Sequence, residues 1–306
     1  MHAMTKIFID GDAGTTGLEI RERLAGRSDI SLLALPQEQR KDAAAKRDIL
    51  ASVDIAILCL PDDAAKETVA LCDALGGQGP RVLDASTAHR VAEGWVYGFA
   101  ELCVGQAAAI ASSRRVANVG CYASGAIALI RPLVDAGLIR PTQPLTINAV
   151  SGYSGGGRQM IEAYESGQAP AFELYALGLE HKHVPEIMAY GKLTQRPLFA
   201  PSVGNFRQGM LVSIPLVLDA LPGKPRAGDL EDAYARHYAD VKHVRPAPAP
   251  ASGKLDALAL NGTDDMEVFV IANEARGHAL LVARLDNLGK GAAGAAVQNL
   301  DLMLGK

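Results

Sequence analysis

The sequence predicts an α/β protein with two parts: a doubly wound parallel sheet in the N-terminal half, followed by an α+β domain with a mainly antiparallel sheet. Short apolar segments alternate with helical segments over the first half of the chain. Residues 54–60 are apolar almost throughout, as expected for a parallel strand that is covered on both faces. Beyond residue 145 the strand-like segments are longer, and they outnumber the helical ones.

The elements of the first half follow from apolar runs and glycine stops. Gly76 and Gly77 end the second helix, because glycine readily adopts the backbone conformation that closes a helix. Strands are expected at 6–10, 30–35, 54–60 and 81–86, and helices at 18–24 and 63–75. A further strand ends at residues 118–120 and leads into a helix over 123–133.

The second half is expected to carry longer strands and a terminal helix. The Pro/Ala-rich stretch 245–252 predicts an exposed loop rather than a domain linker. Residues 289–304 are small and apolar, which predicts a helix at the C-terminus. Strands are expected at 145–151, 210–218, 266–273 and 278–285, and helices at 157–164, 184–192 and 230–237.

Composition excludes several classes of protein. Hydrophobic residues make up 49% of the chain and charged residues 21%, as in ordinary globular proteins. The net charge of −4 and the absence of a basic stripe predict no nucleic-acid partner. The apolar runs are too short to span a bilayer, and no apolar signal core opens the chain. We therefore expect a cytoplasmic protein with no membrane partner, and no metal site, because the four cysteines lack zinc spacing.

A glycine-rich turn follows the first expected strand. Gly11, Gly14 and Gly17 have the spacing G-x-x-G-x-x-G and precede a helical segment. Such glycines let backbone N–H groups approach a pyrophosphate at a helix N-terminus. An ordinary strand-to-helix turn also suits glycine and threonine, but the place after the first strand of a β-α-β unit favours a Rossmann-like dinucleotide site. The candidate cofactor-binding residues here are Gly11, Ala13, Gly14, Thr15, Thr16 and Gly17.

The end of the second strand bears on the choice between NAD and NADP. NAD sites usually carry an acidic residue there for the ribose hydroxyls. Residues 34–37 contain no acid, and Arg40 and Lys41 follow them. These cations favour NADP, whose additional phosphate needs a positive partner, although they also fit a solvated surface pair.

Cys121 is the candidate nucleophile. It follows the expected strand and Gly120, at the start of a helical run. A thiol at a helix N-terminus experiences the positive end of the helix dipole, which favours the thiolate. Cys59 and Cys72 fit small core residues, and Cys103 has no glycine turn to expose it. A core role for Cys121 also remains open on position alone.

Two histidines are candidates for the proton transfers that a thiolate enzyme needs. His181 and His183 flank Lys182 and precede Val-Pro-Glu. A general acid or base must lie close to the sulfur, and a histidine fulfils both roles near neutral pH. A surface histidine pair is the alternative, and the residues alone do not separate His181 from His183.

Together these motifs resemble the N-acetyl-gamma-glutamyl-phosphate reductase family, in its shorter, type 2 branch. The resemblance rests on the glycine turn, on Asn-x-Gly-Cys-Tyr around Cys121, and on three further segments. These segments are 151–158 (SGYSGGGR), 181–186 (HKHVPE) and 287–291 (NLGKG). Each motif alone is unspecific, but the set extends from the first strand to the last helix.

The resemblance implies a two-domain fold like that of aspartate-semialdehyde and glyceraldehyde-phosphate dehydrogenases. Residues 1–118 and 286–306 would form the NADP-binding domain, and 119–285 the catalytic and dimerisation domain. The implied reaction is the NADPH-dependent reduction of N-acetyl-glutamyl 5-phosphate to N-acetyl-glutamate 5-semialdehyde in arginine biosynthesis. The implied partners are this small acyl phosphate and further copies of the chain, in a dimer or tetramer.

The resemblance also implies roles for individual residues. Cys121 would form a thioester, with His181 as first choice for acid–base work and His183 in reserve. Arg90 would bind phosphate, and Arg158 would bind the substrate carboxylate or hold the glycine-rich loop; a structural salt bridge is the alternative for either. Ser151, Gly152, Tyr153 and Ser154 would line the acyl pocket. Ser86, Arg40, Lys290 and Gly291 complete the expected cofactor contacts.

Four other functions remain compatible with the sequence. An aspartate-semialdehyde dehydrogenase or an amino-adipate analogue would use the same chemistry on a different substrate. A non-catalytic NADP-binding sensor would bind cofactor without turnover. A cysteine hydrolase would work without cofactor, and would leave Gly11, Gly14 and Gly17 unexplained.

Overall fold

The computed structural model describes residues 4–306, and the chain forms two compact units. Unit 1 contains the residues up to Phe99, Ala107–Val119 and Ala295–Lys306. Unit 2 contains Ala100–Gln106 and Gly120–Gly294. In this division the residues 286–294 belong to unit 2, and only the last twelve residues of the C-terminal segment belong to unit 1.

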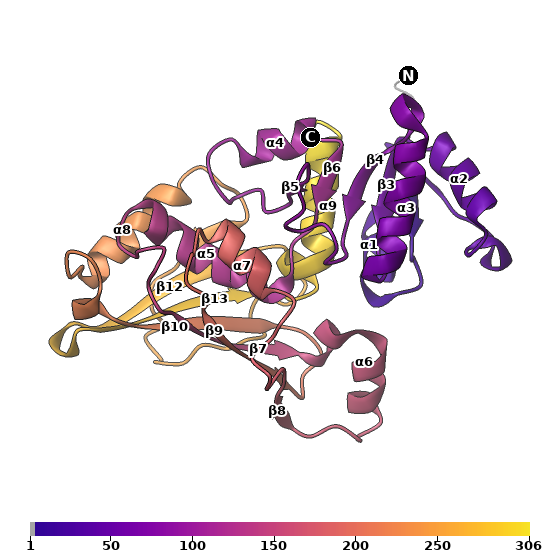
Figure 1. Cartoon of the computed structure of the whole chain (residues 1–306). Helices are drawn as coiled ribbons and strands as arrows, with labels where there is room; N and C mark the ends of the chain where they lie inside the picture. The colour runs from indigo at the N-terminus through magenta and orange to yellow at the C-terminus, as the bar shows by residue number, and fades with distance from the viewer. Residues whose placement is uncertain (1–3) are drawn as a thin grey trace. The chain divides into compact units, whose positions relative to one another are not determined.

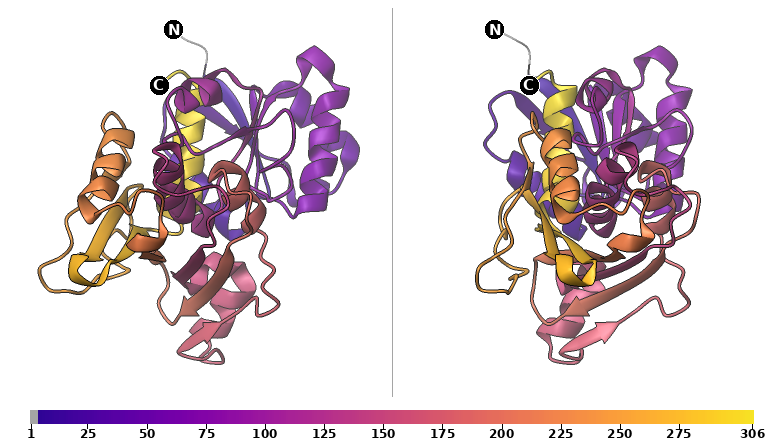
Figure 2. Two further views of the ribbon diagram at one scale, coloured as in Figure 1. Left: turned by 60° about the vertical axis from the view of Figure 1, so that its left-hand side comes forward. Right: turned by 90° about the vertical axis from the view of Figure 1, so that its left-hand side faces the viewer.

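Unit 1 is built on a parallel sheet, as the sequence predicted. Its strand order is β2-β1-β3-β4-β6-β5, and every strand pair described in it is parallel. The strands are β1 (Thr5–Asp10), β2 (Ile30–Leu33), β3 (Ile55–Leu58), β4 (Arg81–Asp84), β5 (Val96–Tyr97) and β6 (Arg115–Ala117). The helices are α1 (Thr15–Leu24), α2 (Ala43–Ser52), α3 (Asp62–Ala74), α4 (Gln106–Ser112) and α9 (Gly294–Met303). Figure 2 shows helices on both sides of this sheet, among them the C-terminal helix.

Helix α2 has no counterpart in the sequence prediction. Its sequence, AAAKRDILAS, buries only Ile49 and Leu50, so it lacks the repeated apolar spacing that identifies a helix. The signal that could have found it is Asp42, whose carboxylate accepts hydrogen bonds from Ala44 N and Ala45 N. Such a cap satisfies N–H groups that the first helical turn leaves open.

Unit 2 contains a seven-stranded mixed sheet in which antiparallel pairs dominate. The order is β11-β12-β13-β10-β7-β9-β8, and the described parallel pairs are β11 with β12 and β7 with β9. The strands are β7 (Thr146–Gly152), β8 (Phe172–Leu174), β9 (Leu198–Gly204), β10 (Met210–Val217), β11 (Val244–Pro246), β12 (Met266–Asn273) and β13 (His278–Leu285). The helices are α5 (Cys121–Asp135), α6 (Gly157–Glu165), α7 (Val184–Tyr190) and α8 (Ala227–His237).

Three strands in unit 2 depart from the prediction; one of them, β8, lies where neither a strand nor a helix was expected. The expected loop at 245–252 is wrong at its start, because Arg245 and Pro246 belong to the edge strand β11. Pro246 is tolerated there because an edge strand leaves one row of N–H positions unpaired. Strand β9 was not predicted at all, since Pro201 interrupts its apolar run; it pairs in parallel with β7 and is largely buried.

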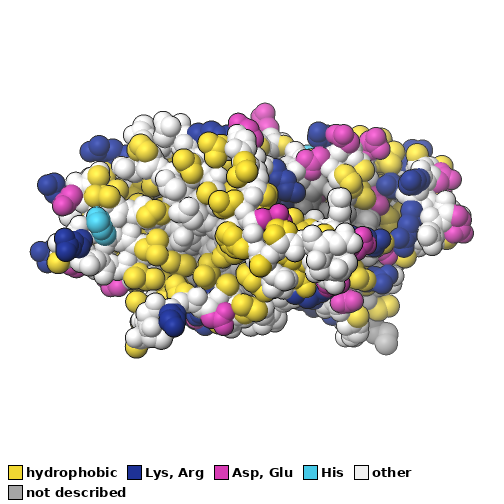
Figure 3. Space-filling model, turned by 90° about the horizontal axis from the view of Figure 1, so that it is seen from below, with side chains coloured by type: hydrophobic (Ala, Val, Ile, Leu, Met, Phe, Trp, Pro, Cys, Tyr) yellow, Lys and Arg dark blue, Asp and Glu magenta, His cyan; other side chains and the backbone are white. Residues whose placement is uncertain are grey.

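The two faces of the unit 2 sheet differ. Figure 1 shows α5, α7 and α8 on one face. Side chains of β10 alternate accordingly: Val212 and Ile214 are fully buried, whereas Val217 is exposed. The opposite face is apolar and open, and Figure 3 shows hydrophobic side chains gathered on it. A hollow of about 710 Å³ on that face is lined by residues that include Val150, Phe172, Leu174, Leu211, Leu280 and Val282. Within residues 4–306, no helix is long and apolar enough to cross a membrane.

Candidate active site

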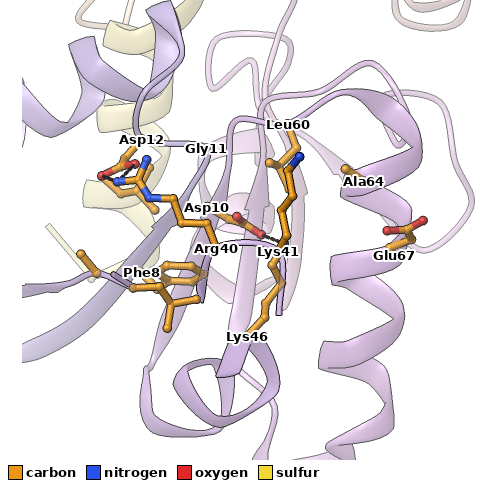
Figure 4. Close-up of a pocket in the computed structure, with 13 residues that line it drawn as sticks. Phe8, Asp10, Gly11, Asp12, Arg40, Lys41, Lys46, Leu60, Ala64 and Glu67 are labelled. Carbon is orange, nitrogen blue, oxygen red and sulfur yellow. Dashed lines mark hydrogen bonds and ion pairs between the residues drawn. The ribbon is translucent and has the colours of Figure 1, made fainter. Parts of the chain in front are cut away.

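A cavity of about 470 Å³ lies in unit 1 at the ends of β1 and β2 (Figure 4). Gly11 and Asp12 of the glycine turn line it, together with Arg40 and Lys41 from the segment after β2. In a doubly wound sheet, ligands bind outside the carboxyl ends of the strands, where this cavity lies. The sequence-predicted glycine turn and Arg40 are therefore brought together at one pocket.

The glycine turn has the backbone that a phosphate site needs. Gly11 has φ +90°, and a Cβ atom there would overlap the carbonyl oxygen of Cys59. Helix α1 begins after Gly14, and within the described chain no side chain caps it. Its first-turn N–H groups therefore have no side-chain acceptor, which suits a bound anion. Ala13 and Gly14 are exposed, Thr15 and Thr16 are half-buried, and Gly17 is buried.

Acidic residues that the sequence analysis missed hold the cations at this pocket. Arg40 Nη2 lies 3.0 Å from Asp12 Oδ1, and Lys46 Nζ lies 2.8 Å from Asp10 Oδ2. Thr68 also donates a hydrogen bond to Asp10. The pattern Asp-Gly-Asp at the end of β1 was the available signal. Open N–H groups of α1 and three lining cations match the diphosphate and additional phosphate of a dinucleotide, so these residues fit such a cofactor.

Arg40→Ala should weaken NADPH binding about tenfold and leave NADH binding nearly unchanged. A charge-assisted hydrogen bond contributes roughly 1.5–3 kcal/mol, and the lower end applies because the Arg40 side chain is 40% exposed. Fluorescence titration of both cofactors measures the two dissociation constants. Arg21→Ala is the matched control, since Arg21 also pairs with Asp12 but does not line the pocket. Equal weakening of NADH and NADPH would contradict a phosphate-specific role.

Ser86 and Arg90 lie in the segment after β4 in unit 1. Ser86 donates from Oγ to Asp84 Oδ2 at 2.7 Å and from its backbone N to Asp84 Oδ1. Arg90 is 7% exposed, and its Nε donates to the carbonyl of Asn118 at 3.0 Å. His89, between them, pairs with Asp84 at 2.6 Å and stacks on Trp95. Arg90 thereby connects this segment to the residue that follows β6.

Cys121 is the first residue of α5 in unit 2, with Gly120 as the N-cap. Its side chain is half-buried, and the described cysteines are all free thiols. Burial, with the nearby carboxylates of Asp84, Asp10 and Asp12, raises the pKa of Cys59 to about 12. Burial raises the pKa of Cys72 to about 11. Both thiols stay protonated near neutral pH, which leaves Cys121 and Cys103 as possible nucleophiles.

The histidine pair packs against Tyr122, the neighbour of Cys121 in the chain. The ring centroids of His181 and His183 each lie 5.9 Å from that of Tyr122. The backbone N–H of His183 donates to His181 Nδ1 at 3.1 Å. In the neutral ring of His181 the proton therefore lies on Nε2, which is 3.4 Å from the Tyr175 hydroxyl. His183 is 5% exposed, whereas His181 is half-buried.

Tyr175 and Glu186 belong to the same cluster and were missed from sequence. The pKa of Tyr175 is raised by burial and by the nearby Cys121. Glu186 is 1% exposed, and its carboxylate accepts a hydrogen bond from Gly120 N at 3.1 Å. Its Oε1 lies 3.9 Å from His183 Nε2. Glu186 thus joins the turn before Cys121 to the histidine pair; its place in the His-Lys-His-Val-Pro-Glu motif was the only signal.

The segment 151–158 is only partly assembled into this cluster. Ser151 and Gly152 end β7 and are buried, and a Cβ on Gly152 would meet the backbone of Arg207 at 2.6 Å. Ser154 accepts a hydrogen bond from Asn287 Nδ2 at 2.9 Å. The Tyr153 ring stacks on Tyr164. Arg158 is exposed on α6.

Lys290 and Gly291 lie in a π-helical turn, Gly289–Ala293. Lys290 Nζ is 2.7 Å from Glu101 Oε2, and both side chains are almost completely buried. A Cβ atom on Gly291 would lie 2.8 Å from Cys121 Cβ. The structure therefore brings Gly291 to Cys121 and commits the Lys290 amine to Glu101.

Comparisons with known proteins identify both parts of the chain. The model of the semialdehyde dehydrogenase NAD binding domain matches residues 6–111, and that of the semialdehyde dehydrogenase dimerisation domain matches 121–287. Aspartate semialdehyde dehydrogenase from Francisella tularensis aligns over 98% of this chain and 100% of its own, with a TM-score of 0.75 and 15% identity. The NADP-bound enzyme of that name from Candida albicans has a TM-score of 0.69 and 13% identity, over 98% and 99%. These likenesses confirm the predicted fold.

Closer relatives share the sequence itself. N-acetyl-gamma-glutamyl-phosphate reductase from Chelativorans sp. (strain BNC1) is 55% identical, over 98% of this chain and 98% of that protein. N-acetyl-gamma-glutamyl-phosphate reductase 2 from Pseudomonas putida is 53% identical, over 98% and 96%. The chain belongs to the N-acetyl-gamma-glutamyl-phosphate reductase family, whose two domains are those of the semialdehyde dehydrogenases.

Proposed function

We propose that this enzyme reduces N-acetyl-glutamyl 5-phosphate to N-acetyl-glutamate 5-semialdehyde with NADPH, as a step of arginine biosynthesis. The observation that carries the proposal is Cys121 at the N-terminus of α5, next in the chain to Tyr122, whose ring lies against His181 and His183. The 52–55% identity to proteins named as this reductase supports the choice of substrate. Aspartate-semialdehyde dehydrogenases match only at 13–16% identity, which supports a common fold alone.

The first chemical step is an acyl transfer to the protein. Cys121 Sγ attacks the acyl carbon, and the bond between that carbon and the phosphate oxygen breaks. A thioester remains on Cys121. His181 takes the thiol proton at Nδ1, which must first release the hydrogen bond from His183 N, and delivers it to the departing phosphate. The N–H groups at the start of α5 would stabilise the oxyanion that forms in this step. Arg90 binds the phosphate, and Ser151, Gly152, Tyr153, Ser154 and Arg158 hold the rest of the substrate.

The second step releases the aldehyde. A bound nicotinamide cofactor would supply the hydride that reduces the thioester carbonyl. Cys121 Sγ would then leave as the thiolate, which releases the aldehyde. His181 returns the thiolate to its resting state with a proton from solvent. NADP is the cofactor that Arg40 and Lys41 favour, and Gly11, Ala13, Gly14, Thr15, Thr16, Gly17, Ser86 and Gly291 complete its contacts.

The reverse reaction gives the sharpest test of this function. With N-acetyl-glutamate 5-semialdehyde, phosphate and NADP, the absorbance of the reduced nicotinamide should rise. Aspartate semialdehyde should react at least about a hundredfold more slowly by kcat/KM, because a site that binds the acetylated chain leaves buried groups unpaired with the shorter one. A preference for aspartate semialdehyde, or no turnover with either aldehyde, would refute the assignment.

We further propose that the enzyme assembles from copies of itself. The family model over residues 121–287 describes a dimerisation domain. Phe172 and Leu174 are more than half exposed on the open apolar face of the unit 2 sheet, and apolar patches of this kind often mark protein–protein interfaces. A dimer or tetramer would cover it. Sedimentation of the purified chain measures the assembly directly.

A further inference from the structure

The ion pair of Lys290 and Glu101 lies deep in unit 2. The Lys290 side chain is 1% exposed and that of Glu101 is 3% exposed, with 2.7 Å between Nζ and Oε2. Burial lowers the pKa of Lys290, and the Glu101 carboxylate opposes this shift. Glu101 comes from the short segment 100–106, more than 180 residues before Lys290 in the chain. The pair therefore fixes two distant segments of unit 2 to each other.

The turn that carries Lys290 packs directly against the candidate nucleophile. A Cβ atom on Gly291 would lie 2.8 Å from Cys121 Cβ and 3.2 Å from Cys121 Cα. On the other side, a Cβ on Gly289 would overlap the carbonyl oxygen of Thr263. Gly291 N donates to the carbonyl of Asp286 at 3.0 Å. The turn is thus confined between the start of α5 and the segment after β11, and a small displacement of it would move Cys121.

We propose that Lys290 and Glu101 are positioning residues for Cys121, which hold the π-turn against the start of α5. This inference rests on the proposed function, in which Cys121 is the nucleophile. In this proposal Lys290 affects the reaction by positioning Cys121, and it does not contact the cofactor directly. π-helical turns inside longer helices are often found at functional sites.

The position of the π-turn should be sensitive to the loss of either partner of the buried ion pair. Desolvation offsets most of the attraction between the two charges, so the intact pair adds little net stability. Removal of one partner leaves the other charge buried and unpaired, which is costly. The turn then shifts so that water reaches the remaining charge, and Cys121 loses its place at the helix N-terminus.

Lys290→Met tests the proposal in the full-length enzyme. We expect kcat to fall about a hundredfold, since a misplacement of about 1 Å costs that much, with KM for NADPH changed less than about threefold. Alkylation of Cys121 by iodoacetamide, followed by mass spectrometry without substrate, should slow about tenfold at pH 7. The thiol measurement does not depend on turnover, so it separates this proposal from the proposed reaction.

Lys192→Met is the matched control. Lys192 Nζ lies 2.7 Å from Asp135 Oδ1, at the opposite end of α5, but this pair is partly exposed. The same substitution there should leave kcat and the alkylation rate unchanged. Lys290→Met with unchanged alkylation and a raised KM for NADPH alone would overturn the proposal in favour of a cofactor contact.

Glu101→Gln provides a second variant if Lys290→Met does not fold. Glutamine keeps the size of the side chain and one hydrogen bond with Lys290. The value of kcat and the rate of Cys121 alkylation should therefore fall, by up to about tenfold. Unchanged values of both would overturn the proposal. The double variant Lys290→Met/Glu101→Gln removes the stranded charge. Its free energy of unfolding should recover relative to Lys290→Met, but kcat should not. Full recovery of kcat would show that charge balance alone matters.

Discussion

Cys121→Ser should lower the rate of reduction by on the order of 10³- to 10⁵-fold while NADPH still binds. A serine hydroxyl stays protonated at neutral pH, so it cannot form the acyl intermediate at a useful rate. The helix dipole at the start of α5 favours an anion, but it cannot ionise a hydroxyl of such high pKa. Turnover in the reverse assay and fluorescence titration with NADPH measure the two quantities separately.

Cys103→Ser is the control for this experiment. Cys103 is another half-buried thiol, and its Sγ lies 4.0 Å from Gln106 Oε1 rather than at a helix start. Its replacement should leave turnover unchanged. Near-normal reduction by Cys121→Ser would disprove the thioester mechanism.

His181→Asn should lower kcat by about 10²- to 10⁴-fold, the usual contribution of a general acid or base. Asparagine Oδ1 can still accept the hydrogen bond from His183 N, so the segment 181–183 keeps its anchor. The variant loses the group that titrates, so the fall in kcat at acidic pH that protonation of His181 causes should disappear. The pH dependence of kcat measures this directly.

His183→Asn distinguishes the two histidines. His183 is buried and lies 3.9 Å from Glu186, so its replacement should chiefly reduce stability and leave the acid limb of the pH profile in place. The opposite result, with the acid limb lost in His183→Asn and kept in His181→Asn, would exchange their roles.

The fold was largely predictable because its signals are local. Residues 55–58 form a buried parallel strand, which their run of apolar residues predicted. Strand β12 occupies 266–273, as expected. Strand β9 escaped prediction because Pro201 breaks its pattern, and it is stabilised by pairing with β7 and β8. Local signals cannot reveal an element that is defined by its partner.

Candidate site residues could be selected from the sequence only where the side chain itself is nucleophilic, titratable near neutral pH or cationic. Cys121, His181 and Arg40 could be selected for this reason. Glu186 and Glu101 look like ordinary surface acids in the sequence, and burial alone makes them special. For Lys290 the family resemblance implied a cofactor contact, and its buried partner Glu101 carries no signal in the sequence.

The C-terminal residues have a consequence for biosynthesis of the chain. Unit 1 includes Ala295–Lys306, whose Leu300 is fully buried and whose Met303 carbonyl accepts a hydrogen bond from Arg81 Nη1 at 2.5 Å. Asn299 donates to the carbonyl of Gly98, and Lys306 pairs with Asp29. A nascent polypeptide therefore cannot complete unit 1 until residues 295–306 have emerged from the ribosome, and unit 2 has the opportunity to fold before it.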